Sequence, residues 1–170
     1  MRPTHFGIDE QFLRRFSPKS FRPDPIDDKS LNALIEAAST APSSFNEQPW
    51  VFVIGKKEAF LSVLTEKNAA WAKGAAAFVL VASRRVFSRN AKPNRWHGFD
   101  SGTAMGFLIL EALKRGISAH PMGGFDAEKA AELFGLEALD LHAVVALGYS
   151  DEPHTMTPRK VLDAIIIDRR

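Results

Sequence analysis

Residues 41–54 read Ala-Pro-Ser-Ser-Phe-Asn-Glu-Gln-Pro-Trp-Val-Phe-Val-Ile, and this segment decides how the rest of the chain is interpreted. Its end, residues 50–54, is wholly apolar and rich in β-forming residue types, which is typical of a strand buried on both faces. Pro42 ends a helical pattern that comes before it, because the residue preceding a proline is pushed out of the helical region. The segment therefore predicts a helix, a polar turn and a buried strand, in that order.

Two helices are predicted on the N-terminal side of this segment. Residues 9–15 form the first, which ends ahead of Pro18. Asp27 is placed to cap the second, since an aspartate there accepts a backbone N–H of the first helical turn. The second helix runs to Ala41, and its apolar residues at helical spacing are Leu31, Leu34, Ile35 and Ala38.

Strands and helices alternate on the C-terminal side. We expect a helix over residues 56–73 with a break near Asn68, a buried strand over 76–82, and the longest helix over 99–115, ended by Gly116. The remaining expected elements are a strand at 117–120, a helix at 127–134 capped by Asp126, a strand at 141–149, and an apolar tail at 161–167 that is either a strand or an arm. This order predicts one layered α/β or α+β domain spanning residues 1–170.

Composition excludes several classes of protein. The chain has 170 residues, 22 Lys plus Arg against 20 Asp plus Glu, and no cysteine. A net charge of +2 does not favour nucleic-acid binding, and the absence of cysteine excludes disulfides, thiolate metal sites and cysteine nucleophiles. No run approaches the roughly 18 apolar residues of a membrane span, and the N-terminus lacks a secretory signal. We therefore expect a soluble, cytoplasmic protein that binds neither nucleic acid nor membrane.

Familiar catalytic motifs are missing. The chain contains neither G-x-G-x-x-G after a strand, nor G-x-x-x-x-G-K-[ST], nor G-x-S-x-G, which argues against Rossmann, P-loop and nucleophile-elbow proteins. Its five histidines include no pair three or four residues apart, so no metal site is expected.

Four segments remain that folding alone does not explain: residues 15–19, 41–50, 121–126 and 159–160. The first and last are basic, the second is a polar turn, and the third holds two adjacent glycines at the end of a strand. Together they suit a ligand that is anionic at one end and a flat, hydrogen-bonding heterocycle at the other.

These segments resemble the FMN-dependent nitroreductase family, in its short form, from Phe12 to about Ile166. The resemblance is strongest at residues 41–50, and it is supported by Arg15-x-Ser17-x-Lys19, by Gly-Gly-Phe-Asp at 123–126 and by Thr-Pro-Arg-Lys at 157–160. It implies an α+β fold of three α/β/α layers with a central, largely antiparallel sheet. It also implies an obligate homodimer that holds two FMN molecules at its interface.

The resemblance also implies which residues contact FMN. The phosphate would be held by Arg15, Ser17, Arg159 and Lys160, with Phe16 in the same motif. The cation of Lys19 would approach the pyrimidine end of the flavin and stabilise the reduced ring. The polar turn of the second subunit would contribute Pro42, Ser43, Ser44 and Asn46. Pro121 and Met122 would lie against the ring, and the backbone N–H of Gly123, beside Gly124, would meet flavin N5.

Other interpretations stay open for several of these residues. The basic cluster around Arg15 also fits a solvated face, and the glycine pair also fits a turn that needs positive φ. Asn68 is the candidate for the polar edge of the flavin, with Lys73 as its rival, and both also fit exposed helix positions. Structural roles are expected for Gln48, Pro49, Trp50, Trp71, Trp96, the phenylalanines and Asp100, the last as a helix-start residue.

The implied activity is ping-pong hydride transfer from NADH or NADPH through FMN to a nitroaromatic, quinone, enone or free flavin, with no catalytic side chain. Flavin-fragmenting or dehalogenating specialists of this family need lid segments for which the chain has little room. An FMN-binding carrier or regulator, or a structural dimer without flavin, is the alternative. The basic residues from Arg84 to Arg95 form either a solvated loop or a site that attracts NADPH.

Overall fold

The fold is described by a computed structural model that covers residues 6–154 and 157–167. One antiparallel sheet of four strands lies at its centre, in the order β1-β2-β4-β3. The strands are β1 (Trp50–Ile54), β2 (Ala77–Arg84), β3 (Ser118–Met122) and β4 (Leu139–Gly148). The predicted strands are all present, and the sheet is antiparallel as the family resemblance implied.

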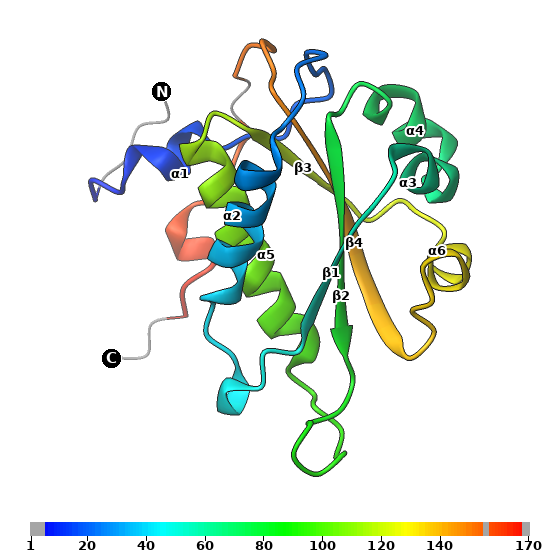
Figure 1. The fold of residues 1–170 in the computed structure, drawn as a ribbon. Coiled ribbons are helices and arrows are strands. Elements are labelled where there is room, and N and C mark those ends of the chain that lie inside the picture. The colour runs from blue at the N-terminus through cyan, green and yellow to red at the C-terminus, as the bar shows by residue number, and fades with distance from the viewer. Residues whose placement is uncertain (1–5, 155–156, 168–170) are drawn as a thin grey trace.

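Helices cover both faces of this sheet (Figure 1). On one face lie α1 (Glu10–Arg14), α2 (Asp28–Ser39) and α5 (His97–Lys114), with α5 in contact with α2, β1, β2 and β3. On the other face lie α3 (Lys57–Val63), α4 (Glu66–Ala72) and α6 (Ala127–Phe134). The predicted three-layer α+β fold is confirmed.

The middle strands explain why the chain forms two cores. In β2, Val79 and Val81 pack with α2 and α5, whereas Phe78 and Leu80 pack on the opposite face with Phe60 of α3. Successive side chains of a strand point to opposite faces, so a strand that is apolar at every position must be covered twice. The Phe60 and Phe78 rings stack with centroids 5.5 Å apart and anchor the second core.

The helix predicted over residues 56–73 is two helices, and the expected break near Asn68 is wrong. Helix α3 ends at Val63, and the extended Leu64 that follows forms an isolated β-bridge with Phe125. The Thr65 N–H then donates to the Gly124 carbonyl at 3.1 Å. Backbone groups that bond a distant segment in this way cannot continue a helix, so the interruption falls at residues 64–65. Smaller shifts are the start of α5 at His97 and the extension of β3 to Met122.

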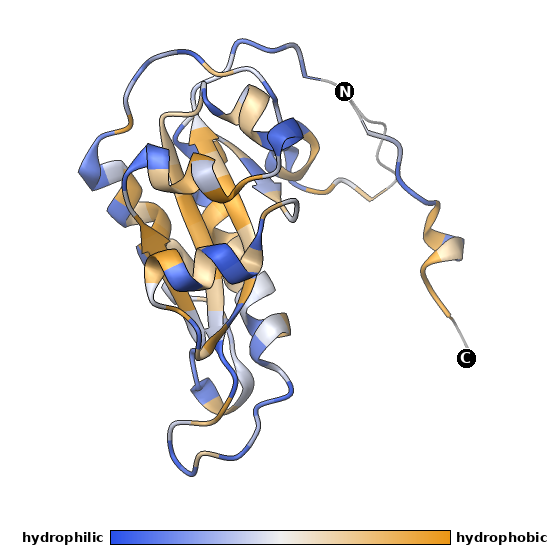
Figure 2. Ribbon diagram, turned by 90° about the vertical axis from the view of Figure 1, so that its right-hand side faces the viewer, coloured by the Kyte–Doolittle hydropathy of each residue, from blue (hydrophilic) through white to orange (hydrophobic). Residues whose placement is uncertain are grey.

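The tail is an arm rather than a strand. Within residues 157–167 it contains one short 3₁₀ helix, η2 (Leu162–Ala164), and it stands away from the sheet and its helices (Figure 2). Its exposed apolar side chains are Val161, Leu162, Ile165, Ile166 and Ile167. Separately, none of the helices in the described part of the chain combines the length and apolarity that crossing a membrane requires.

Candidate functional site

The first basic segment is bound to the end of β3. His120 Nδ1 lies 2.8 Å from the Pro18 carbonyl oxygen, and because a carbonyl only accepts, this ring nitrogen carries the proton. The ring of Trp71, from α4, lies against the same imidazole with centroids 4.4 Å apart. Residues 15–19, strand β3 and helix α4 therefore meet at one place, although they lie far apart in the sequence.

Arg15 is half-buried and lies close to a second cation. Its Nη1 donates to Ser17 Oγ at 3.3 Å, and no carboxylate pairs with it among the residues that the structure describes. Burial lowers the pKa of Arg15, and the charge of Arg159 lowers it further. The charge of the second basic segment thus acts on the first, in which Phe16 packs edge-on against His154 at 5.1 Å.

The glycine pair follows β3 directly and lies beside α4. Asn68 Nδ2 donates to the Gly124 carbonyl at 2.9 Å, and a Cβ on Gly124 would come within 2.6 Å of that nitrogen. Neither Gly123 nor Gly124 has a positive φ, so the interpretation as a turn needing positive φ is wrong. Space against Asn68 explains Gly124, whereas Gly123 is exposed and would tolerate a Cβ.

Asn68 and Lys73, the two candidates for the polar edge of the flavin, lie in different surroundings. Asn68 lies against the glycine pair, whereas Lys73 caps the end of α4 and lines a separate hollow with Phe21 and Lys57. The side chain of Lys19 is exposed, and its backbone N–H donates to Glu152 Oε2 at 2.8 Å. Of the two rivals, only Asn68 is held beside Gly124.

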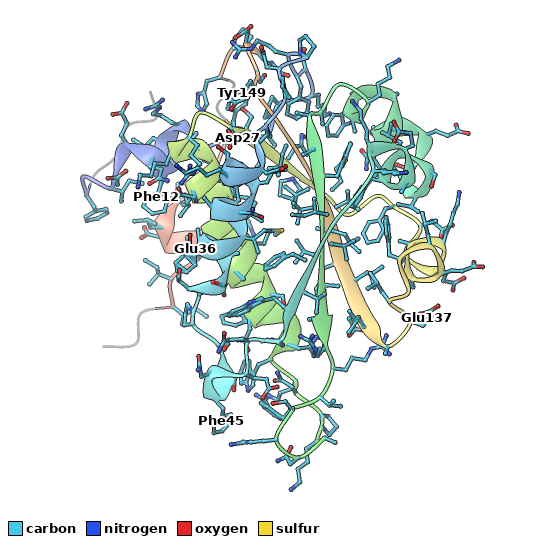
Figure 3. All side chains as sticks on the ribbon, viewed as in Figure 1. Phe12, Asp27, Glu36, Phe45, Glu137 and Tyr149 are labelled. Carbon is cyan, nitrogen blue, oxygen red and sulfur yellow. The ribbon has the colours of Figure 1, made fainter. Side chains whose placement is uncertain are left out.

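The polar turn lies in a different part of the molecule from the other candidate residues. Figure 3 labels Phe45, in the turn, at the foot of the molecule, and Phe12, in α1 near Arg15, at its upper left. Pro42, Ser43, Ser44 and Asn46 therefore do not meet the other candidate residues within one chain. The turn contains the short 3₁₀ helix η1 (Ser44–Asn46).

The conformation of the turn is unusual and is held from outside. Phe45, Asn46 and Gln48 have φ of 55°, 55° and 51°, a region that costs non-glycine residues free energy. Asp100, which is 4% exposed, accepts the Ser44 N–H at 3.0 Å from the first turn of α5. Asp100 is a helix-start residue as predicted, and its carboxylate also fixes the turn.

Several aromatic residues lie outside the core, contrary to prediction. Trp96 is 42% exposed, and Phe45 and Phe99 are each 72% exposed, whereas Trp50 is buried at the start of β1 as expected. These exposed rings lie in or next to the polar turn and at the start of α5. The polar turn comes before β1, and the 85–96 loop comes after β2. Contacts between the two segments hold the turn and the loop together.

A buried polar network was missed by sequence reasoning. Ser83 is fully buried on β2, and its Oγ lies 2.7 Å from His97 Nδ1 and 2.6 Å from His142 Nε2. His97 Nε2 in turn lies 3.4 Å from Asp140, which pairs with Arg85. These residues come from β2, β4, α5 and a loop, so no spacing in the sequence signals the network.

Two partly buried histidines should make the stability of the fold depend on pH. Burial lowers the pKa of both His120 and His142 below the ordinary value. Below about pH 6.5 the unfolded chain then binds more protons than the folded one, so stability is lost as the pH falls through that value. We expect the urea midpoint to drop between pH 8 and pH 5.5, and to drop less in His142→Gln. The exposed His154→Gln is the control, and it should leave the pH dependence of the urea midpoint as it is. If His142→Gln also leaves that pH dependence unchanged, His142 does not cause the loss of stability in acid.

Comparison with known proteins agrees with this architecture. The model of the nitroreductase family matches residues 13–62 and 55–149. An NADH dehydrogenase of Thermus thermophilus is 28% identical, over 92% of this chain and 93% of that protein. A solved structure of an oxidoreductase containing FMN is 33% identical, covers 87% of this chain and 79% of that chain, and has a TM-score of 0.82.

A further solved structure supports the fold alone. The nitroreductase family protein of Streptococcus pneumoniae TIGR4 is 21% identical, with a TM-score of 0.84 over 94% of this chain and 98% of that chain. Since the family model spans both cores and the whole sheet, the resemblance found in the sequence is confirmed, and the chain belongs to the nitroreductase family.

Proposed function

We propose that the protein is an FMN-dependent NAD(P)H oxidoreductase that acts as a homodimer. The observation that carries the proposal is the half-buried Arg15, which bonds Ser17 Oγ and has no carboxylate partner among the described residues, while the charge of Arg159 acts on it as well. A half-buried Arg15 without an acidic partner in the described part of the chain, joined by the charge of the exposed Arg159, suits a dianion, and the similar structure that contains FMN indicates which one. We also propose that residues 1–170 form one domain, because both cores share β2 and β4.

The residues around this pair fit a phosphate. Arg15 can donate two parallel hydrogen bonds to phosphate oxygens, and the Ser17 hydroxyl adds a neutral donor. Arg159 and Lys160 bring further positive charge from the arm. The alternative of a merely solvated basic face is less suited to Arg15, because burial of an unpaired guanidinium is unfavourable without an anion.

The residues at the end of β3 fit a flavin ring. Gly123 is exposed, and its N–H has no acceptor among the described residues, so it can donate to a ring nitrogen. Asn68 keeps its side-chain oxygen available after donating to Gly124, which favours it over Lys73 at the polar edge. Lys19 supplies a cation and Pro121 an apolar side, whereas Met122 is 3% exposed and packs with Phe60 in the second core, so its predicted place against the ring is wrong. When bound, FMN supplies hydride acceptance and delivery, which no side chain here could provide.

A second copy of the chain completes this site. The polar turn lies at the opposite end of the molecule from Arg15, so Pro42, Ser43, Ser44 and Asn46 can reach the flavin only from a partner. The apolar arm and the exposed ring of Phe99 give such a partner apolar surface to cover. Nitroaromatics, quinones and enones are the proposed acceptors, because flat, electron-poor molecules can stack where the nicotinamide leaves.

The proposal is tested by the colour of the purified protein. We expect absorbance near ~450 nm from bound flavin, which anaerobic NADH or NADPH bleaches rapidly and a nitroaromatic restores. Steady-state rates with varied donor and acceptor should give the parallel lines of ping-pong kinetics. Flavin that binds but is bleached only by dithionite would favour the carrier, and protein that takes up no FMN would contradict the proposal altogether.

A further inference from the structure

The loop between β2 and α5 is ordered and is tied to the polar turn. Val86 and Pro93 form a β-bridge across it, and the Asn94 N–H donates to the Arg85 carbonyl at 2.8 Å. The Ser88 N–H donates to Glu47 Oε1 at 2.7 Å, which joins the loop to the turn. The backbone of the basic loop is therefore fixed against residues 43–48, while its basic side chains remain exposed to solvent.

Arg89 occupies a particular place in this loop. Its guanidinium carbon lies 4.3 Å from the centre of the Phe45 ring and 5.3 Å from that of Phe87, and the two rings meet edge-on at 5.8 Å. Cation–π contact fixes the side chain but leaves its N–H donors unused. Arg95 lies in the same way over Trp96, at 4.5 Å.

The five basic residues of the loop are thus not equivalent. Arg85 is bonded to Asp140 through Nε and to the Leu139 carbonyl through Nη2, so its charge is already paired. Arg89 and Arg95 have no carboxylate partner among the residues that the structure describes. Each of these two guanidiniums has free donors and lies next to an exposed aromatic ring, which suits a ligand that is both phosphorylated and aromatic.

We propose that Arg89, assisted by Arg95, binds a phosphate group of the dinucleotide hydride donor. This inference rests on the proposed function, in which the polar turn lies beside the flavin of the partner. Phe45 belongs to that turn, so Arg89 stands next to the flavin site of the partner. When the nicotinamide of the donor lies on the flavin, the adenosine end of the same dinucleotide must extend over nearby protein. The loop offers cations to the phosphates of the dinucleotide, whereas residues 43–48 of the turn contain none.

The test compares donors with and without phosphate. Arg89→Gln is expected to lower kcat/KM for NADPH about 10- to 100-fold, the effect of losing a charge-assisted hydrogen bond. Flavin reduction by 1-benzyl-1,4-dihydronicotinamide, which has no phosphate, should stay within about twofold of the unmodified protein. The salt dependence of kcat/KM for NADPH should also become weaker.

Comparing NADPH with NADH shows which phosphate group of the dinucleotide Arg89 binds. A loss confined to NADPH assigns the 2′-phosphate to Arg89, and an equal loss with NADH assigns the pyrophosphate. Lys56→Gln, which removes the same charge just before α3, is the matched control and should change neither donor. The inference is overturned if Arg89→Gln reduces NADPH and NADH rates no more than this control does. It stands apart from the proposed function, which fails if the protein takes up no FMN or if no donor reduces the flavin.

Discussion

Arg15→Gln should weaken FMN binding about 10- to 100-fold, because it removes a bidentate, charge-assisted contact to phosphate. The same change should leave the protein without FMN as stable as before or more stable. The reason is that Arg15 lies near Arg159 with no carboxylate partner in the described part of the chain, so its removal relieves repulsion. Flavin fluorescence on titration gives the dissociation constant, and thermal unfolding of apoprotein gives the stability.

The neighbouring arginine provides the control for this experiment. Arg14 is exposed at the end of α1, so Arg14→Gln makes the same change in charge one residue away. We expect FMN affinity to change less than about threefold in this variant, as for other exposed charges. Equal affinities in Arg15→Gln and the unmodified protein would refute the assignment of the phosphate to Arg15.

Ser83→Ala should lower the free energy of unfolding by about 2 kcal/mol, because it leaves nitrogens of two half-buried imidazoles without partners. The Ser83 hydroxyl has one hydrogen, so it donates to one imidazole and accepts from the other. Since His97 Nε2 faces Asp140, its proton belongs there, and Nδ1 accepts from Ser83. His142 Nε2 must then donate to Ser83 Oγ. Urea denaturation with an unchanged slope measures the loss.

A second buried serine makes the comparison sharp. Ser101 is also fully buried, but its hydroxyl has no hydrogen-bond partner in the part of the chain that the structure describes. Ser101→Ala removes an unsatisfied polar group from a helix and adds a better helix former, so stability should stay the same or rise. If the two alanine variants behave alike, the hydrogen bonds of Ser83 do not contribute to stability.

Local features of the fold were predicted well because their causes lie within a few residues. Asp27 accepts the Ser30 N–H at 2.8 Å, and Asp126 accepts the Lys129 N–H at 3.0 Å, as expected of helix caps. Gly116, with φ of 72°, follows α5 where a left-handed residue was expected. Strand β1 has the predicted bounds, since an apolar run of that length is itself the signal, but its predicted burial on both faces is wrong because it is an edge strand whose Ile54 is 44% exposed.

Predictions failed where a distant segment decides the outcome. The helix break moved to residues 64–65 because Phe125 and Gly124 bond the backbone there. Trp96 and Phe99 are exposed because α5 begins at the end of β2, beside the polar turn, where no further layer of the described residues covers it. Apolarity alone gave no sign of this, since it measures the preference of a residue and not the space available to it.

The amino-acid sequence by itself determined the helices, the strands, the family and the four segments from which the site is built. Only the tertiary structure decided which of these segments meet. The Pro18–His120 and Asn68–Gly124 hydrogen bonds join residues 102 and 56 positions apart, whereas the polar turn remains at the other end of the molecule. Helix caps and hydrophobic periodicity depend on residues only a few positions apart. Contacts between residues far apart in the sequence depend instead on how the whole sheet assembles.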